Sequence, residues 1–326
     1  MTLSSTRIQQ VCMSEVFSDL WGSAVRKRYG LTPYTSPDHP ALFFGCYPPK
    51  RHRSGRVRKD VRRIERHRSL AVVAWCGGDS RAATTSAARC YYRDILHRPN
   101  VAHIAISRSV AEDLQLLGVP YVHVPLCTVS TGLYYPVPLG PKVYVYTSFA
   151  APAVYGWPIV EEVRRRLPRV KFAIHASSAP HCISREQLQK VYEKCFIGLR
   201  PTPHDGLSNT VVELGLMGRR CIWNGWTPDA IPWTSVEGIV KAIKKERARV
   251  GSTYPKISER MASYINVGED WLRASFYKWS PGKIIVKPNV SKRKIERSQQ
   301  KRVKKLAEQK RKLQKLASYK SRLRKK

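Results

Sequence analysis

The fold is indicated most clearly by residues 198–220, which read Gly198-Leu-Arg-Pro-Thr-Pro-His-Asp-Gly-Leu-Ser-Asn-Thr-Val-Val-Glu-Leu-Gly-Leu-Met-Gly-Arg-Arg220. The first of these residues predict the end of a short apolar strand at Leu199. A polar loop over residues 200–207 follows, and a helix is expected to begin near Ser208 or Asn209, because both are good N-cap residues. Strand, loop and helix in this order indicate an open α/β sheet, whose ligands bind at the carboxyl ends of the strands.

Two charged residues in this stretch are candidates for ligand binding. The backbone N–H groups at the helix start favour an anion, and Arg200, at the carboxyl end of the strand, can add charge-assisted hydrogen bonds to it. Glu213 stands among apolar residues, where a carboxylate costs free energy unless it is paired or meets a ligand. Two interpretations of Glu213 stay open: an exposed or ion-paired structural residue, or an acceptor of hydrogen bonds from sugar hydroxyls.

The same alternation of apolar strands and amphipathic helices extends in both directions along the chain and predicts parallel α/β sheets. Expected strands cover residues 40–47, 70–75, 101–106, 121–126, 142–146, 171–175, 196–199 and 221–224, and expected helices cover 110–117 (N-capped by Ser107), 158–167, 185–195, 209–217, 236–249 and 259–277. A segment rich in Gly, Pro, Thr and Tyr at 127–141 predicts a linker. We therefore expect two Rossmann-like domains, 1–135 and 136–280, and a basic tail, 281–326, that is helical or disordered.

The charge of the chain is concentrated in two short segments. The 326 residues include 59 Lys and Arg against 23 Asp and Glu, a formal net charge of +36. Residues 287–326 hold 18 basic and 2 acidic side chains, net +16, and residues 50–68 hold 10 and 2, net +8. Such blocks contact polyanions or remain solvated. We expect both segments to bind a polyanion, with DNA favoured and an anionic membrane surface as the alternative.

Other features of the composition exclude several classes of protein. No apolar run is long enough to span a bilayer, and the first residues lack the pattern of a secretory signal. The eight cysteines form no CxxC pair, so free, mostly buried thiols in a reducing cytoplasmic compartment are expected. No Asp-x-Asp pair or His cluster with ligand spacing occurs, so no metal site is expected.

The carboxylates of the opening stretch also point to a known family. Asp205, seven intervening residues and Glu213, with Gly206 and Asn209 between them and Gly218 closing the helix, resemble the nucleotide-sugar motif of retaining glycosyltransferases with the GT-B fold. That resemblance implies two Rossmann-like domains facing a cleft. It also implies that a carboxylate at Glu213 holds the ribose hydroxyls of a UDP- or GDP-sugar, and that one at Asp205 lies near the donor sugar as a catalytic residue.

The sequence departs from that family in two ways. Asp205 stands where Glu is usual, and the loop after Tyr146 lacks the family's basic pair for the diphosphate. We therefore expect Arg200 to take the place of that pair. The residues expected to bind the donor are Arg200, Gly206, Leu207, Ser208, Asn209 and Glu213.

A second loop, Cys76-Gly-Gly-Asp-Ser-Arg81, resembles the first-domain loop of this family that faces the cleft. Gly77 and Gly78 permit a close approach of backbone to ligand. Asp79 is expected to be catalytic or to contact an acceptor hydroxyl, and Arg81 and Ser107 are expected to contact phosphate or acceptor. The alternative is a simple turn in which Asp79 bonds its own backbone.

Together these observations favour a nucleotide-sugar-dependent glycosyltransferase, and the resemblance implies that it retains the anomeric configuration and needs no metal or further cofactor. The preferred acceptor is modified DNA, as for some phage glycosyltransferases, which places the enzyme in the host cytoplasm. Alternatives are a glycan or lipid-linked sugar acceptor at an anionic membrane surface, a non-enzymatic basic nucleic-acid-binding protein on an α/β scaffold, and a nucleotide-sugar epimerase.

Overall fold

The computed structural model describes residues 7–277 apart from residues 18, 50–58, 130 and 177–184. The chain divides into two compact units, 1–283 and 284–326. The predicted basic tail and half of the ten basic residues of the segment 50–68 lie outside the described residues.

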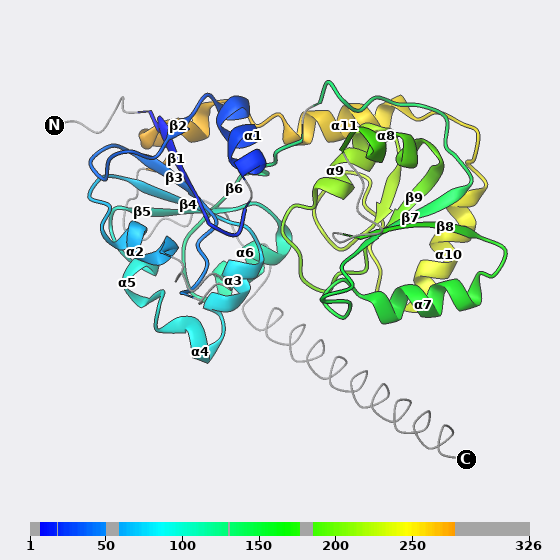
Figure 1. Ribbon diagram of the computed structural model, residues 1–326, viewed down its shortest axis with the longest axis horizontal. Helices are drawn as coiled ribbons and strands as arrows, with labels where there is room; N and C mark the ends of the chain where they lie inside the picture. Colours follow the sequence, from blue (N-terminus) through cyan, green and yellow to red (C-terminus); the bar gives the residue numbers. More distant parts are fainter. Residues whose placement is uncertain (1–6, 18, 50–58, 130, 177–184, 278–326) are drawn as a thin grey trace, which may run out of the picture. The chain divides into compact units, whose positions relative to one another are not determined.

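Six parallel strands form the first sheet, in the order β2-β1-β3-β4-β5-β6 (Figure 1). Its strands are β1 (Gln10–Met13), β2 (Thr32–Pro33), β3 (Ala41–Phe44), β4 (Ala71–Trp75), β5 (Val101–Ala105) and β6 (Val122–His123). The accompanying helices are α1 (Asp19–Tyr29), α2 (Asp60–Glu65), α3 (Gly78–Ala83), α4 (Ser86–Arg89), α5 (Arg93–Leu96) and α6 (Arg108–Leu116).

Four parallel strands form the second sheet, in the order β10-β9-β7-β8 (Figure 1). Its strands are β7 (Lys142–Thr147), β8 (Lys171–Ala176), β9 (Cys195–Leu199) and β10 (Arg220–Ile222). The helices that follow or precede them are α7 (Trp157–Arg166), α8 (Arg185–Glu193), α9 (Asn209–Leu216), α10 (Val236–Arg247) and α11 (Pro255–Ile265), and two short 3₁₀ turns, η1 (Asp270–Leu272) and η2 (Ala274–Tyr277), come last.

The central strands β3, β4, β5 and β9 are almost entirely apolar, with His103 of β5 as an exception. Every residue of β3, β4, β5 and β9 is buried. Parallel strands covered by helices on both faces need continuous apolar runs, whereas a half-exposed sheet would alternate. The predicted pair of parallel α/β sheets is therefore confirmed, and the predicted strands coincide with β3 to β10 within a few residues.

The structure corrects the expected helix over 259–277. α11 ends at Ile265, and Gly268 follows with a φ of +58°, a left-handed conformation that breaks the helix. β1 and α1 near the amino terminus were not predicted from the sequence. The three apolar residues of β1 stand between Gln10 and Ser14, so no longer apolar run marks the strand, as one does at β3.

The segment after α11 returns to the first sheet. The N–H of Ile8 donates to the carbonyl of Leu272 at 2.7 Å, and the ring of Trp271 packs edge-on against Tyr29 of α1, with centroids 5.2 Å apart. Residues 270–277 therefore contact the half that the sequence analysis bounded at residue 135. In the described part of the chain, every helix is too short or too polar to cross a membrane.

Candidate functional site

Arg200 and Asp205 form an ion pair at the carboxyl end of β9. Two guanidinium nitrogens of Arg200 donate to the Asp205 carboxylate, one of them from Nη2 to Oδ1 at 3.1 Å. The rings of Tyr146 and Tyr155 lie 5.7 and 5.6 Å from the Arg200 guanidinium carbon. Burial lowers the pKa of Arg200, but the Asp205 carboxylate outweighs burial and leaves the pKa above its usual value. Arg200 is therefore a fixed positive charge held by a carboxylate and two aromatic rings.

The loop that carries Asp205 touches the loop after β4. A Cβ placed on Gly77, whose φ is +115°, would lie 2.7 Å from the backbone nitrogen of Gly206. A Cβ on Gly206 would lie 2.1 Å from the carbonyl oxygen of Cys76. The hydroxyl of Ser107 donates to the carbonyl of Asp205 at 2.9 Å. Two of the predicted glycines and Ser107 therefore meet at one place, where both glycines lack room for a side chain.

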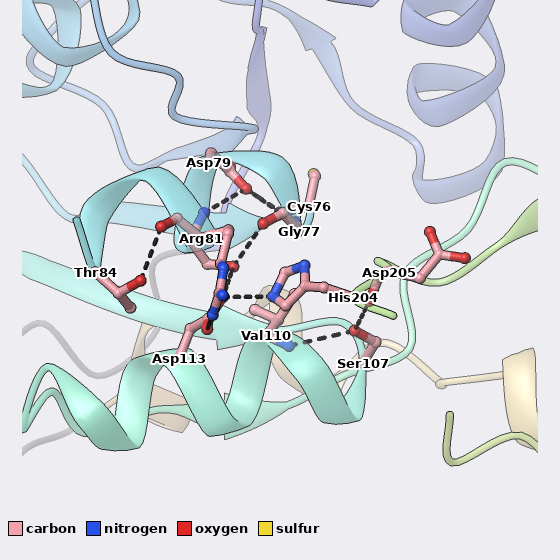
Figure 2. A network of polar contacts seen from close by, with 11 residues as sticks. Cys76, Gly77, Asp79, Arg81, Thr84, Ser107, Val110, Asp113, His204 and Asp205 are labelled. Atoms are coloured by element: carbon pink, nitrogen blue, oxygen red, sulfur yellow. Dashed lines mark hydrogen bonds and ion pairs between the residues drawn. The ribbon is translucent and has the colours of Figure 1, made fainter. Parts of the chain in front are cut away.

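Asp113 of α6 is the centre of a polar network beside this contact (Figure 2). Its Oδ2 accepts a hydrogen bond from the Ser80 hydroxyl at 2.8 Å and lies 2.7 Å from Nε2 of His204. Arg81, the predicted phosphate contact, lies 3.9 Å from its Oδ1 and is largely exposed. Asp113 was not among the residues predicted from the sequence. It could have been singled out as Glu213 was, because it is a carboxylate among the buried apolar residues of its helix, as Glu213 is on α9.

Ser107 caps α6 as predicted. Its hydroxyl accepts from the N–H of Val110, and its backbone is extended, as an N-cap requires. The same hydroxyl also donates to the carbonyl of Asp205 (Figure 2). The residue that caps α6 beside the first sheet therefore also contacts the loop after β9 of the second sheet.

Asp79 is fully buried and accepts hydrogen bonds from backbone N–H groups. Cys46 donates to its Oδ2 at 2.8 Å, and Cys76, Gly77 and Ser80 donate to its Oδ1 at 2.8 to 2.9 Å. Burial raises the pKa of this carboxyl group, and the N–H bonds oppose that rise by stabilising the charged form. The carboxylate therefore ties the end of β3 to the loop that opens α3. This matches the alternative of a turn bonding its own backbone, and contact with an acceptor stays a prediction.

Glu213 lies inside the second half, on α9, with 5% of its surface exposed. The hydroxyl of Tyr192 donates to its Oε2 at 2.7 Å, and the Tyr192 ring packs edge-on against Tyr144 with centroids 4.7 Å apart. Glu213 is therefore not an exposed residue. Its carboxylate is held in place by a tyrosine from α8.

α9 begins where the sequence predicts, and Ser208 occupies its N-cap position. The expected side-chain hydrogen bond between the capping residue and the helix is not made. Leu207 and Ser208 are buried, and the amide of Asn209 donates to the hydroxyl of Thr128 at 2.9 Å. Gly78, the remaining predicted residue, opens α3 against the ring of Tyr47.

Several buried polar atoms at this edge of the second sheet have no partner among the described residues. They are Oγ1 of Thr147 at the end of β7, Oγ1 of Thr202 after β9, and Oδ1 of Asn209 at the start of α9. Thr147 is 1% exposed and Thr202 is 4% exposed. Buried polar groups are nearly always hydrogen-bonded in native proteins, so three such atoms at one sheet edge fit a polar ligand.

Comparisons with known proteins add to the description of the fold. No protein-family model matches this chain, and no curated protein matches it in sequence. Among solved structures, sucrose-phosphate synthase from Thermosynechococcus elongatus is similar with a TM-score of 0.51 and 11% identity, over 78% of this chain and 74% of the synthase.

Two further solved structures are similar to a lesser degree. TarM matches 78% of this chain with a TM-score of 0.49 and 11% identity. A mutant of S. aureus TarM in complex with fondaparinux, alpha-GlcNAc-glycerol and UDP matches 77% with a TM-score of 0.48 and 10% identity. This chain spans 57% of the length of each TarM chain. The parallel sheets of six and four strands and the likeness to the synthase show that the chain has the GT-B fold.

Proposed function

We propose that this protein is a glycosyltransferase that binds a nucleotide-sugar at the carboxyl edge of the four-stranded sheet. The proposal rests on three buried side-chain atoms, on Thr147, Thr202 and Asn209, that have no hydrogen-bond partner among the described residues. They belong to the same sheet edge as the Arg200–Asp205 pair. Such an edge is where α/β sheets bind ligands, and the GT-B fold is shared with a sucrose-phosphate synthase.

In this proposal the donor lies with its ribose on Glu213 and its diphosphate on Arg200 and the uncapped start of α9. Arg200 keeps its charge, and α9 presents first-turn N–H groups that no side chain caps. When the bond between the sugar and the diphosphate breaks, the departing phosphate gains negative charge, and fixed donors of this kind stabilise it. We propose that Asp205 lies near the transferred sugar, with retention of the anomeric configuration and without a metal.

The acceptor proposed is DNA, on the charge of the basic segments 50–68 and 287–326. A glycan or lipid-linked sugar at an anionic membrane is the rival acceptor. Donor profiling separates them: nucleotide release from UDP- and GDP-sugars is measured with DNA, with anionic vesicles carrying a lipid-linked sugar, and with neither. Release that rises only with vesicles would contradict the DNA acceptor.

The proposal predicts that Glu213→Gln weakens binding of the donor. The substitution keeps the shape and the hydrogen bond from Tyr192 but removes the charge that accepts from ribose hydroxyls. Hydrogen bonds to a charged group contribute about 1.5–3 kcal/mol, so we expect a loss of donor affinity of at least about tenfold. Calorimetric titration of the full chain with UDP- and GDP-sugars measures it.

Glu259→Gln is the matched control, because Glu259 is an exposed residue of α11. It should bind the donor as the wild type does. Equal affinity of Glu213→Gln and wild type would remove Glu213 from the donor site. Failure of every nucleotide-sugar to bind would instead favour a non-enzymatic nucleic-acid-binding protein.

A further inference from the structure

A basic groove lies at the amino-terminal edge of the four-stranded sheet, at the opposite strand ends from Arg200. Its volume is about 680 Å³. Its walls come from the starts of β7 and β8 and from the end of α7 with the turn that follows. The lining residues are Lys142, Glu161, Arg164, Arg165, Leu167, Pro168, Val170, Lys171 and Phe172. Four cationic side chains therefore face one carboxylate.

Two of these cations are placed directly side by side. Lys142 and Lys171 are register partners, since each is the first residue of its strand and β7 pairs with β8 in parallel. Like charges at paired positions of a sheet repel and destabilise it. Within the described residues, neither lysine forms a salt bridge. An anion bound between them would turn that repulsion into attraction.

The last turn of α7 adds a further free cation. Arg165 is bound by Glu162 through two hydrogen bonds, whereas Arg164 is exposed and has no salt bridge in the part of the chain that the structure describes. Basic residues at a helix carboxyl terminus complement the helix dipole, which accounts for the arginines. It does not account for the lysine pair, which two strands supply.

We propose that this groove binds the phosphate backbone of a nucleic acid. Lys and Arg side chains from separate elements are the usual donors to phosphate oxygens, and a groove with apolar walls such as Leu167, Val170 and Phe172 focuses their field on a ligand inside it. The cations of the groove come from two strands and one helix, so a narrow chain of phosphates lying in it can contact them together, and we take a nucleic acid as its occupant. The groove is separate from the proposed donor site, and the proposal does not depend on glycosyl transfer.

Amine footprinting of the full chain tests the location directly. The protein is treated with an acylating reagent with and without a single-stranded DNA oligonucleotide, and the modification of each lysine is measured by mass spectrometry. We expect DNA to protect Lys142 and Lys171, while Lys244 and Lys245, exposed in the last turn of α10, stay reactive. Because the readout is specific to each lysine, binding by the basic tail does not mask it.

Matched variants supply the second readout. Lys171→Gln combined with Arg164→Gln removes two expected phosphate contacts, so the slope of log affinity against log salt should fall by about 1.4 for single-stranded DNA. Lys244→Gln with Lys245→Gln removes the same charge elsewhere and should leave the slope unchanged. Thermal unfolding of both variants checks that they fold as the wild type does.

Two results would overturn the proposal. One is equal reactivity of Lys142 and Lys171 with and without DNA, together with equal salt slopes of the two double variants. The other is protection of these lysines by vesicles of phosphatidylserine and phosphatidylcholine but not by DNA, which would assign the groove to lipid headgroups.

Discussion

Arg219 is a charged side chain in the interior of the second half, with 1% of its surface exposed. Its guanidinium donates to backbone carbonyls, among them those of Tyr192 at 2.8 Å, Pro138 at 3.0 Å and Cys195 at 3.1 Å. Burial lowers the pKa of Arg219 to about 10, which leaves it charged at neutral pH. It therefore ties the linker before β7 to the end of α8 and the start of β9.

Replacing Arg219 by Ala should destabilise the protein strongly. Each buried carbonyl left without a donor costs about 1–3 kcal/mol, so the loss in the free energy of unfolding should exceed about 3 kcal/mol. Urea unfolding followed by circular dichroism measures it. Arg247→Ala, an exposed position in the last turn of α10, is the control and should change the free energy by less than about 0.5 kcal/mol. A small effect of Arg219→Ala would show that the linker is held by other contacts.

Single residues could be singled out from the sequence where they break a local pattern. Glu213 did so among apolar neighbours, and the structure places it inside the second half with Tyr192 as partner. Asp79 was singled out too, and three of its four backbone donors belong to its own loop, as the alternative of a simple turn predicted. The fourth donor, Cys46 after β3, and the Tyr192 partner of Glu213 are distant in sequence, so the local pattern did not identify them.

At the scale of elements, the β9–α9 unit was predictable almost to the residue. The strand ends at Leu199 and the helix begins at Asn209, as expected. An apolar run and a capping residue are local signals, and they act through neighbouring backbone groups. The contact of Gly77 with Gly206 was not visible in the sequence, because it joins two loops more than a hundred residues apart.

That contact predicts the effect of Gly206→Ala. A methyl group at this position would lie 2.1 Å from the carbonyl oxygen of Cys76, so the loop that carries Asp205 must move away. We expect activity with a nucleotide-sugar to fall by at least about tenfold, since small displacements of positioning groups are costly, and the melting temperature to fall as well, because the added methyl group meets backbone rather than a flexible side chain. Nucleotide release and thermal unfolding are the measurements.

Gly238→Ala is the control for this variant, because Gly238, like Gly206, has no positive φ, and an added Cβ there would meet only Oγ of Ser235, at 3.5 Å. It reports the effect of an added methyl group without a clash. If Gly206→Ala released nucleotide as fast as the control, the contact between the two loops would have no role in positioning the site.

At the scale of the whole molecule, stability should depend on pH through His103. The Trp75 ring N–H donates to its Nδ1 at 3.1 Å, and its Nε2 lies 3.1 Å from the carbonyl of Leu96. The ring is therefore neutral, with Nε2 carrying the hydrogen. Burial lowers the pKa of His103 from 6.5 to about 4, so the folded protein resists protonation that the unfolded chain accepts.

The neutral His103 ring stabilises the folded state fully above about pH 6.5. This stabilisation is lost as the pH falls toward 4, where the folded and unfolded states both become protonated. The free energy of unfolding changes by about 3 kcal/mol in total over this range. Urea midpoints should therefore fall between about pH 7 and about pH 4.5. His103→Gln, which cannot titrate, should show a smaller fall that reports the remaining groups. Equal falls in the two proteins would contradict the assignment.

Apolar periodicity and capping residues were enough to predict two parallel α/β sheets, the β9–α9 unit and the cap at Ser107, because these signals act between near neighbours. Folding of the whole chain was needed to bring Ser80 and His204 to Asp113, Cys46 to Asp79, and residues 270–277 to the first sheet. These contacts depend on which distant segments meet, and burial makes such contacts specific because a buried polar group without a partner costs free energy.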